Sequence, residues 1–172
     1  MITVINATNR PNNNTKIFSA MYLQMLEKKE VKSHLFSFED LPQAIDLLEL
    51  YSPSKNLFKQ IVDKYIISSE KLVFIIPEYN GSYPGILKLF IDACNPEIFK
   101  NKKIAMVGVA TGRAGNSRGM DDLTNVFHYL GAHILPYKLP ISSILKIIDN
   151  NTCSDESTIA AMNKQVSLLI DF

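Results

Sequence analysis

The sequence has little that would suit metal binding or disulfide formation. Only two cysteines occur among 172 residues, Cys94 and Cys153, and they lie far apart without the short spacing of metal ligands. So few cysteines fit a reducing compartment. The three histidines, His34, His128 and His133, share no spacing with one another or with a carboxylate. We therefore expect no metal site, and core or surface roles for these side chains.

Neither sign of charge is in excess, and long apolar runs are absent. Eighteen basic and 17 acidic side chains give a net charge of +1, so nothing global favours nucleic acid or an anionic membrane. No apolar run approaches the roughly 18 residues needed to span a bilayer. Residues 1–5 lack the basic region and cleavage pattern of a signal peptide. We expect a cytoplasmic protein with no nucleic-acid or membrane partner.

Two nucleotide-binding motifs are also missing. No Gly-x-Gly-x-x-Gly follows the first apolar run, which disfavours a dinucleotide site of the Rossmann type. No Gly-x-x-x-x-Gly-Lys-Ser/Thr is present, which argues against an NTPase. The composition, with 47% hydrophobic and 20% charged residues, is ordinary for a globular protein. A chain of this length predicts a single domain covering residues 1–172.

Strand-like and helical patterns alternate along the whole chain. Strands are predicted at 2–5, 31–38, 72–76, 103–110 and 133–137, and helices near 18–26, 58–66, 87–94, 123–130 and 159–170, with an irregular stretch at 41–54. The second strand is the weakest and suits a sheet edge. This alternation predicts a three-layer α/β fold, a doubly wound five-stranded parallel sheet covered on both faces. Strand order 2-1-3-4-5, the flavodoxin-like topology, is the leading possibility.

The segment 77–87, directly after the third predicted strand, is the most informative part of the chain. A wholly apolar run ends abruptly there in proline, an acid, polar side chains and two glycines, which force a loop. The loop is longer than the 2–6 residues of an ordinary connection. In open α/β sheets such a loop lies at the carboxyl end of a strand, where ligands bind. We interpret it as one wall of a binding site.

The loop after the first strand, residues 6–15, is suited to an anion. It offers hydroxyls, side-chain amides and one guanidinium at the start of a predicted helix, where the helix dipole favours negative charge. Arg10 can chelate a phosphate monoester, while Thr8, Asn13 and Thr15 can donate hydrogen bonds to it. The alternative is that Asn13 or Asn14 caps the helix and the rest of the loop is solvated.

The loop after the fourth strand, residues 110–119, contains three glycines. These let a backbone approach a flat ligand closely and direct N–H groups at it. The alternative is a flexible turn in which Asn116 or Ser117 caps the next helix. The first, third and fourth strands are neighbours in the predicted topology, so the three loops converge. Together they suit a ligand with a phosphate tail and a planar, hydrogen-bonding ring, such as FMN.

At these residues the sequence resembles the NADPH-dependent FMN reductase family, flavodoxin-like flavoproteins that reduce quinones, azo compounds or chromate. The family segment Pro-Glu-Tyr-Asn-x-Ser-x-Pro-Gly-x-Leu-Lys, continuing into Ile-Asp, matches nearly throughout from Pro77 to Asp92. In the family's first loop, Gly-Ser-x-Arg-x-x-Ser-x-Asn, the Ser, Arg, Ser and Asn places are taken by Thr8, Arg10, Asn13 and Thr15. In the fourth-strand loop Asn116 interrupts the family's glycine pair.

The resemblance implies where FMN binds. Phosphate would contact Thr8, Arg10, Asn13 and Thr15; the isoalloxazine would lie along Pro77, Glu78, Tyr79, Asn80 and Gly81, with its pyrimidine side near Thr111, Gly112 and Gly115. Family members are usually homodimers or homotetramers with the flavin near the interface. We interpret the apolar stretch 141–148 as an interface element rather than a flap.

The activity implied is transfer of hydride from NADPH or NADH, through the flavin, to a quinone, free flavin or similar small acceptor. The flavin carries the chemistry, so no side chain is predicted to be an obligate acid or base. One alternative is an electron carrier of the flavodoxin type, but its usual phosphate loop, Thr/Ser-x-Thr-Gly-x-Thr, is missing. The other is a non-enzymatic protein on the same scaffold that binds FMN weakly or not at all.

Overall fold

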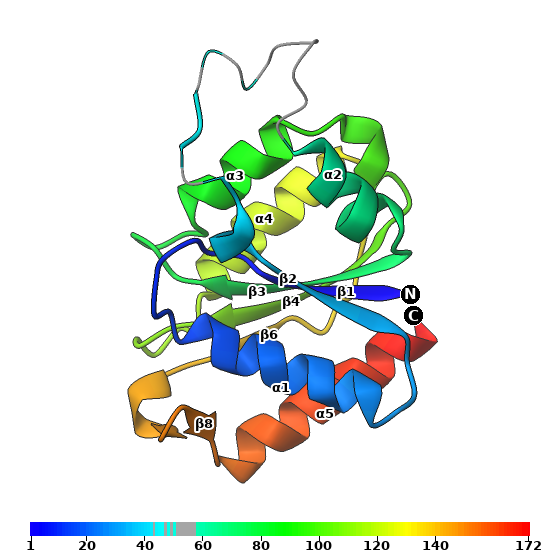
Figure 1. Ribbon diagram of the computed structural model, residues 1–172. Coiled ribbons are helices and arrows are strands. Elements are labelled where there is room, and N and C mark those ends of the chain that lie inside the picture. Colours follow the sequence, from blue (N-terminus) through cyan, green and yellow to red (C-terminus); the bar gives the residue numbers. More distant parts are fainter. Residues whose placement is uncertain (43, 47, 49, 51–57) are drawn as a thin grey trace.

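A computed structural model describes residues 1–42, 44–46, 48, 50 and 58–172. Positions 43, 47, 49 and 51–57, part of which fall in the stretch predicted to be irregular, lie outside the described residues. Figure 1 shows a central sheet with helices on both of its faces.

The sheet has the predicted order. Its strands are β1 (Ile2–Asn6), β2 (Ser33–Ser37), β3 (Lys71–Pro77), β4 (Lys103–Val109) and β5 (His133–Ile134), arranged β2-β1-β3-β4-β5. All of the neighbouring pairs are parallel. The central strands are buried because they are covered on both sides, which explains their continuous apolar runs. β2 lies at an edge, as its mixed polar and apolar sequence predicts, and the flavodoxin-like topology is confirmed.

The helices divide into two layers (Figure 1). One face of the sheet carries α1 (Thr15–Glu27) and α5 (Glu156–Asp171), and the other carries α2 (Lys59–Ile61) with a π-helical turn (Val62–Ile67), α3 (Gly85–Asp92) and α4 (Ser117–Tyr129). Each layer has its own apolar core. Phe18, Tyr22 and Leu169 are fully buried against one face, whereas Phe90 and Phe127 are fully buried against the other. Burying apolar side chains of this size is the main source of stability.

The fifth strand position differs from the prediction. A strand was expected over 133–137, but β5 ends at Ile134, and β6 (Leu139–Ile141) then resumes parallel pairing with β4. Pro136 lies in the break, where its missing N–H prevents ladder bonding. Gln165 of α5 fills the break: its Nε2 donates to the carbonyls of Met106 at 3.0 Å and Tyr137 at 2.8 Å.

The stretch interpreted as an interface element is internal to the chain at Ile141 and Ile144, whereas Leu145 is exposed. Ile141 belongs to β6, and Ile144 begins a 3-10 helix (Ile144–Lys146); both are buried in the same core as α1 and α5. A short hairpin, β7 (Ile148–Asp149) and β8 (Thr152–Cys153), follows before α5. The interface interpretation is therefore wrong for Ile141 and Ile144, because apolar spacing alone does not distinguish a core strand from a docking surface.

Both cysteines are buried free thiols. Among the helices the structure describes, none is long and apolar enough to cross a membrane. Across the same residues, no group of three His, Cys, Asp or Glu side chains is arranged to hold a metal ion.

Candidate functional site

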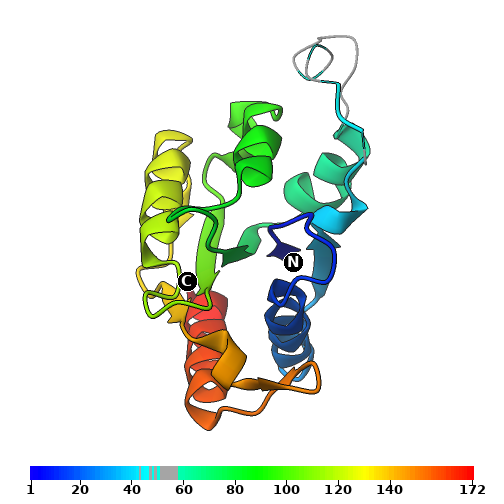
Figure 2. The same ribbon diagram turned by 90° about the vertical axis from the view of Figure 1, so that its left-hand side faces the viewer.

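The loops after β1, β3 and β4 meet at the carboxyl edge of the sheet, the edge that faces the viewer in Figure 2. They enclose a cavity of about 450 Å³, a size typical of sites for cofactors. Its lining is Arg10, Pro11, Asn12, Asn13, Asn14, Thr15, Pro77, Glu78, Tyr79, Val109, Ala110, Thr111 and Ile144. Parallel strands bring these loops together because their carboxyl ends share one edge.

A side-chain contact joins the loop after β1 to the loop after β3. The hydroxyl of Thr8 lies 2.7 Å from that of Tyr79, and the backbone N–H of Arg10 donates to Thr8 Oγ1 at 3.2 Å. Thr8 is fully buried and is not itself part of the cavity lining. It therefore holds the ring of Tyr79, which does line the cavity, against the first loop.

Asn13 organises the first loop and the start of α1. Its Nδ2 donates to the carbonyl of Arg10 at 2.7 Å, and its Oδ1 accepts from the N–H of Lys16 at 3.0 Å. Asn14, at the N-cap position, makes no capping hydrogen bond with its side chain. Asn13 thus performs the capping role considered as the alternative, and one amide hydrogen remains as a donor for a ligand. Thr15, 2% exposed, lies beside it in the lining.

Asn80 and Gly81 form the tip of a tight turn. Tyr79 and Ser82 exchange backbone hydrogen bonds of 2.9 and 3.1 Å, and φ is +53° at Asn80 and +80° at Gly81. Two left-handed residues in this position make a type I′ turn, for which Asn-Gly is the preferred pair. Neither residue lines the cavity, although Tyr79 at the base of the turn does.

The loop after β4 contributes less of the lining than the sequence predicted. Thr111 reaches the cavity, but Gly112 and Gly115 do not. Gly112 accepts a hydrogen bond from the N–H of Ser143 at 2.9 Å. Gly115 packs against β6: a Cβ at this position would lie 2.7 Å from the Cβ of Pro140, so only glycine fits.

Sequence reasoning missed the apolar part of the lining. Val109 and Ala110 form this apolar part at the end of β4. Their position at the carboxyl end of a predicted strand was the feature of the sequence that could have identified them. Ile144 also lines the cavity, because its N–H donates to the carbonyl of Ala110 at 3.2 Å. No motif marked Ile144; its place depends on β6 pairing with β4.

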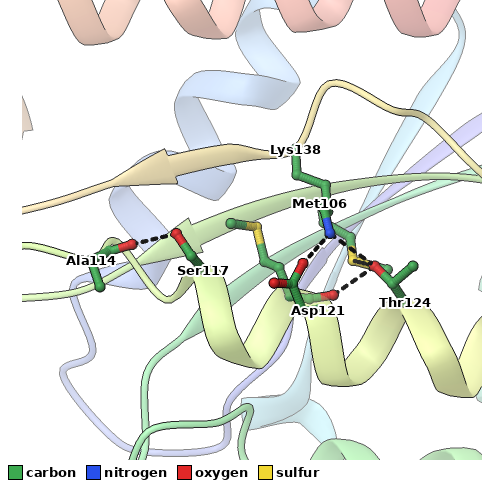
Figure 3. Close-up of polar contacts among 7 residues, drawn as sticks. Met106, Ala114, Ser117, Asp121, Thr124 and Lys138 are labelled. Carbon is green, nitrogen blue, oxygen red and sulfur yellow. Dashed lines mark hydrogen bonds and ion pairs between the residues drawn. The ribbon is translucent and has the colours of Figure 1, made fainter.

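The start of α4 is fastened to the sheet and to the preceding loop (Figure 3). The Ser117 hydroxyl donates to the carbonyl of Ala114 at 2.7 Å. Lys138, just before β6, forms an ion pair with Asp121, and its ammonium also lies 3.5 Å from Thr124 Oγ1. α4 therefore begins at a fixed place relative to the cavity.

The charges and surfaces of the site fit FMN. The positive end of the α1 dipole faces the first loop, and the first turn of that helix contains no acidic residue. Arg10 is exposed in the lining, and within the described part of the chain it forms no ion pair. Pro77, Val109 and Ala110 are buried apolar residues across the cavity. An anionic tail and a flat ring therefore both find matching groups.

A separate cavity of about 390 Å³ lies between β6 and the start of α5. Lys146, Asp155, Ser157 and Thr158 are among its lining residues. Asp155 there accepts from the N–H of Thr158 at 2.8 Å and caps α5. None of the residues predicted to bind FMN lines this cavity. Its Asp155 carboxylate serves as the N-cap of α5.

Comparison with known proteins gives a consistent result. The family model described as NADPH-dependent FMN reductase matches residues 1–145. NAD(P)H-dependent FMN reductase LOT6 of Saccharomyces cerevisiae is 29% identical over 139 residues, which cover 77% of this chain and 69% of that protein. NAD(P)H-dependent FMN reductase PA1204 of Pseudomonas aeruginosa is 37% identical over 73 residues, 41% of this chain and 40% of that one. The structure of FerB from Paracoccus denitrificans, a flavoenzyme NAD(P)H:(acceptor) oxidoreductase, superimposes with a TM-score of 0.78 at 24% identity, covering 99% of this chain and 94% of FerB.

Proposed function

Because the chain belongs to the NADPH-dependent FMN reductase family, we propose that it transfers hydride from NADPH or NADH, by way of FMN, to a quinone, free flavin or similar small acceptor. Dependence on FMN and NAD(P)H follows from the family; the acceptor class is the proposed part. The single observation that carries the proposal is the cavity of about 450 Å³, where the β1, β3 and β4 loops meet.

The two ends of the cavity take different roles in this proposal. Arg10, Asn13 and Thr15, at the start of α1, would hold the phosphate, because a guanidinium and helix N–H groups favour an anion. Thr8, which lies outside the lining, would contribute indirectly by holding the Tyr79 ring in place through their hydrogen bond.

The ring of the cofactor would lie along the β3 and β4 loops. The predicted contacts are Pro77, Glu78, Tyr79, Asn80, Gly81, Thr111, Gly112 and Gly115. Pro77, Glu78, Tyr79 and Thr111 line the cavity, whereas Asn80, Gly81, Gly112 and Gly115 belong to the same loops but lie outside the lining.

When bound, FMN supplies the hydride chemistry, and the chain supplies position and electrostatics. Backbone N–H groups of Asn80 and Gly81 take no part in closing their turn, so they are available as donors to the ring. The Arg113 side chain, exposed on the β4 loop, would add positive charge near the pyrimidine side. No side chain is required to transfer a proton.

Reconstitution tests the proposal. The purified chain is titrated with FMN by absorbance, and NADPH and NADH oxidation is then followed with a quinone, free FMN or no acceptor. Acceptor-dependent oxidation of either nucleotide by the FMN-loaded chain is the expected result. A chain that binds FMN but oxidises neither nucleotide would overturn the reductase proposal and favour an electron carrier.

We propose further that the chain forms a homodimer or homotetramer. An apolar groove of about 480 Å³ lies between α3 and α4, lined in part by Ile91, Cys94, Val126 and Leu130. Tyr129, at its rim, is 92% exposed, which is unusual for so large an apolar ring. Such patches commonly mark protein interfaces.

A cytoplasmic location stays a prediction.

A further inference from the structure

A buried amide connects the loop after β4 with the end of β3. Asn116 is fully buried, with its backbone in the left-handed region at φ +60°. Its Nδ2 donates to the carbonyl of Ile76 at 3.1 Å and to that of Pro77 at 3.0 Å. These are the last two residues of β3, immediately before the loop 78–83 that is proposed to contact the flavin ring.

The end of β3 is consequently fixed from two directions. The N–H of Glu78 donates to the carbonyl of Val109 at 3.1 Å, which continues the pairing with β4 by one residue. Asn116 satisfies the carbonyls of Ile76 and Pro77, which are buried in an apolar layer and would be costly to leave without partners. The direction in which the chain leaves the sheet therefore depends on the Asn116 side chain together with the last bond to β4.

The far limb of the same loop rests on the first turn of α4. At Gly119 an added Cβ would lie 2.7 Å from the carbonyl carbon of Ser82, 2.8 Å from the N of Tyr83 and 2.3 Å from Asn116 Oδ1. The Ser82 hydroxyl donates to Asp122 Oδ2 at 2.6 Å. Asn116 thus holds the end of β3 from which the 78–83 loop starts, while Gly119 and Asp122 contact the far limb of that loop.

We propose that Asn116 is a positioning residue, which sets where the 78–83 loop meets the flavin ring. This inference rests on the proposed function. Asn116 is not itself part of the cavity lining and, on this proposal, does not touch the cofactor; it acts through the carbonyls of Ile76 and Pro77, and Pro77 lines the cavity. Glycine at this position would adopt the same backbone conformation but would supply neither hydrogen bond.

Asn116→Gly tests the inference, because it keeps the left-handed backbone and removes only the amide. Gln165→Ala is the matched control: Gln165 is also fully buried and also donates to two backbone carbonyls, but at the β5–β6 break, outside the cavity lining. The FMN dissociation constant is measured by flavin fluorescence quenching, the bound flavin by its visible band, and the apoprotein by its melting temperature.

We expect Asn116→Gly to raise the FMN dissociation constant about tenfold or more, as the loss of two buried hydrogen bonds allows, and to shift the visible band toward that of free FMN. Gln165→Ala should lower the melting temperature and leave FMN affinity within about twofold of wild type, because its contacts hold a different part of the sheet. Equal losses of affinity in the two variants, or wild-type affinity in Asn116→Gly, would overturn the inference. A wild-type chain that binds no FMN would overturn the proposed function with it.

A second pair of variants keeps the test valid if Asn116→Gly does not fold. The Ser82–Asp122 bond is exposed, so its loss should not unfold the chain. Asp122→Ala should weaken FMN binding severalfold, while Asp122→Asn, which retains an acceptor for the Ser82 hydroxyl, should lose less. Identical FMN affinities in Asp122→Ala and wild type would show that the start of α4 does not position the loop.

Discussion

Thr8 and Tyr79, 71 positions apart in the sequence, lie with their hydroxyl oxygens 2.7 Å apart. This hydrogen bond ties the loop after β1 to the loop after β3 at the point where both border the same cavity. Two segments that the sequence singled out separately are therefore one structural unit.

The Thr8–Tyr79 bond should appear as a coupling energy. Thr8→Ala and Tyr79→Phe each remove one partner, and their double mutant removes both. We expect a coupling of about 0.5–1.5 kcal/mol in the free energy of unfolding, the net value of a typical hydrogen bond. Urea denaturation of the apoproteins measures it. Strict additivity of the two single substitutions would mean that the bond contributes nothing.

Arg10 should contribute to FMN affinity through the phosphate alone. Arg10→Ala is expected to weaken FMN binding by about 1.5–3 kcal/mol, the range for a charge-assisted hydrogen bond. Riboflavin, which lacks the phosphate, should bind the variant and the wild type equally. Arg118→Ala, an exposed arginine outside the cavity lining, is the matched control for lost charge. Equal effects on FMN and riboflavin would place the phosphate elsewhere.

Gln165 should be important for stability rather than for the site. Gln165→Ala leaves the buried carbonyls of Met106 and Tyr137 without their donor, which should cost about 1–3 kcal/mol in the free energy of unfolding. Denaturant titration measures this loss. Gln165→Glu, which can donate only when its carboxyl is protonated, should be less stable at neutral than at acidic pH. A stability equal to wild type in Gln165→Ala would show that water replaces the amide.

Stability should fall at alkaline pH because of Cys94. Burial raises the pKa of this thiol from 9.0 to about 12. The pKa of the Cys94 thiol is higher in the folded chain than in the unfolded chain. The contribution of the neutral thiol to the free energy of unfolding is therefore complete below pH 9 and is lost as the pH rises toward 12. The slope from this group approaches about 1.4 kcal/mol per pH unit in that window. Denaturation at several pH values checks this, and Cys94→Ala should show a shallower decline than wild type.

Tyr129 should be important for assembly. Tyr129→Lys places a charge at the rim of the α3–α4 groove and should convert the oligomer to monomers, as light scattering would report. Ile67→Lys, an equally simple change at another exposed apolar residue, should leave the oligomer intact. If both variants keep the wild-type mass, the interface lies on another surface.

The strand order and the convergence of loops could be predicted from sequence because both follow from short-range patterns. Apolar runs such as that of β3, and the proline and polar residues that follow them, place the ends of β1, β2, β3 and β4 within a residue or two. Once the strands are assumed to be parallel, right-handed crossover connections leave few possible strand orders. The loops after β1, β3 and β4 must then share one edge of the sheet.

What sequence could not supply depends on contacts between distant residues. The break between β5 and β6 is bridged by Gln165, nearly thirty positions beyond Tyr137. Asn116 looked like a helix cap, yet its amide faces the end of β3, because the left-handed backbone turns the side chain inward. Ile144 reaches the cavity only through β6. No local pattern carries this information.

Asparagines hold many of the left-handed backbone positions in this chain, among them Asn12, Asn80, Asn101 and Asn116. Glycine would adopt the same conformation, but it would also give the denatured chain more conformations to lose on folding. With only seven glycines in the sequence, the tight turns are made by residues that restrict the denatured ensemble. Some of the resistance of this fold to heat should therefore be entropic, originating in conformations that the unstructured polypeptide is unable to sample.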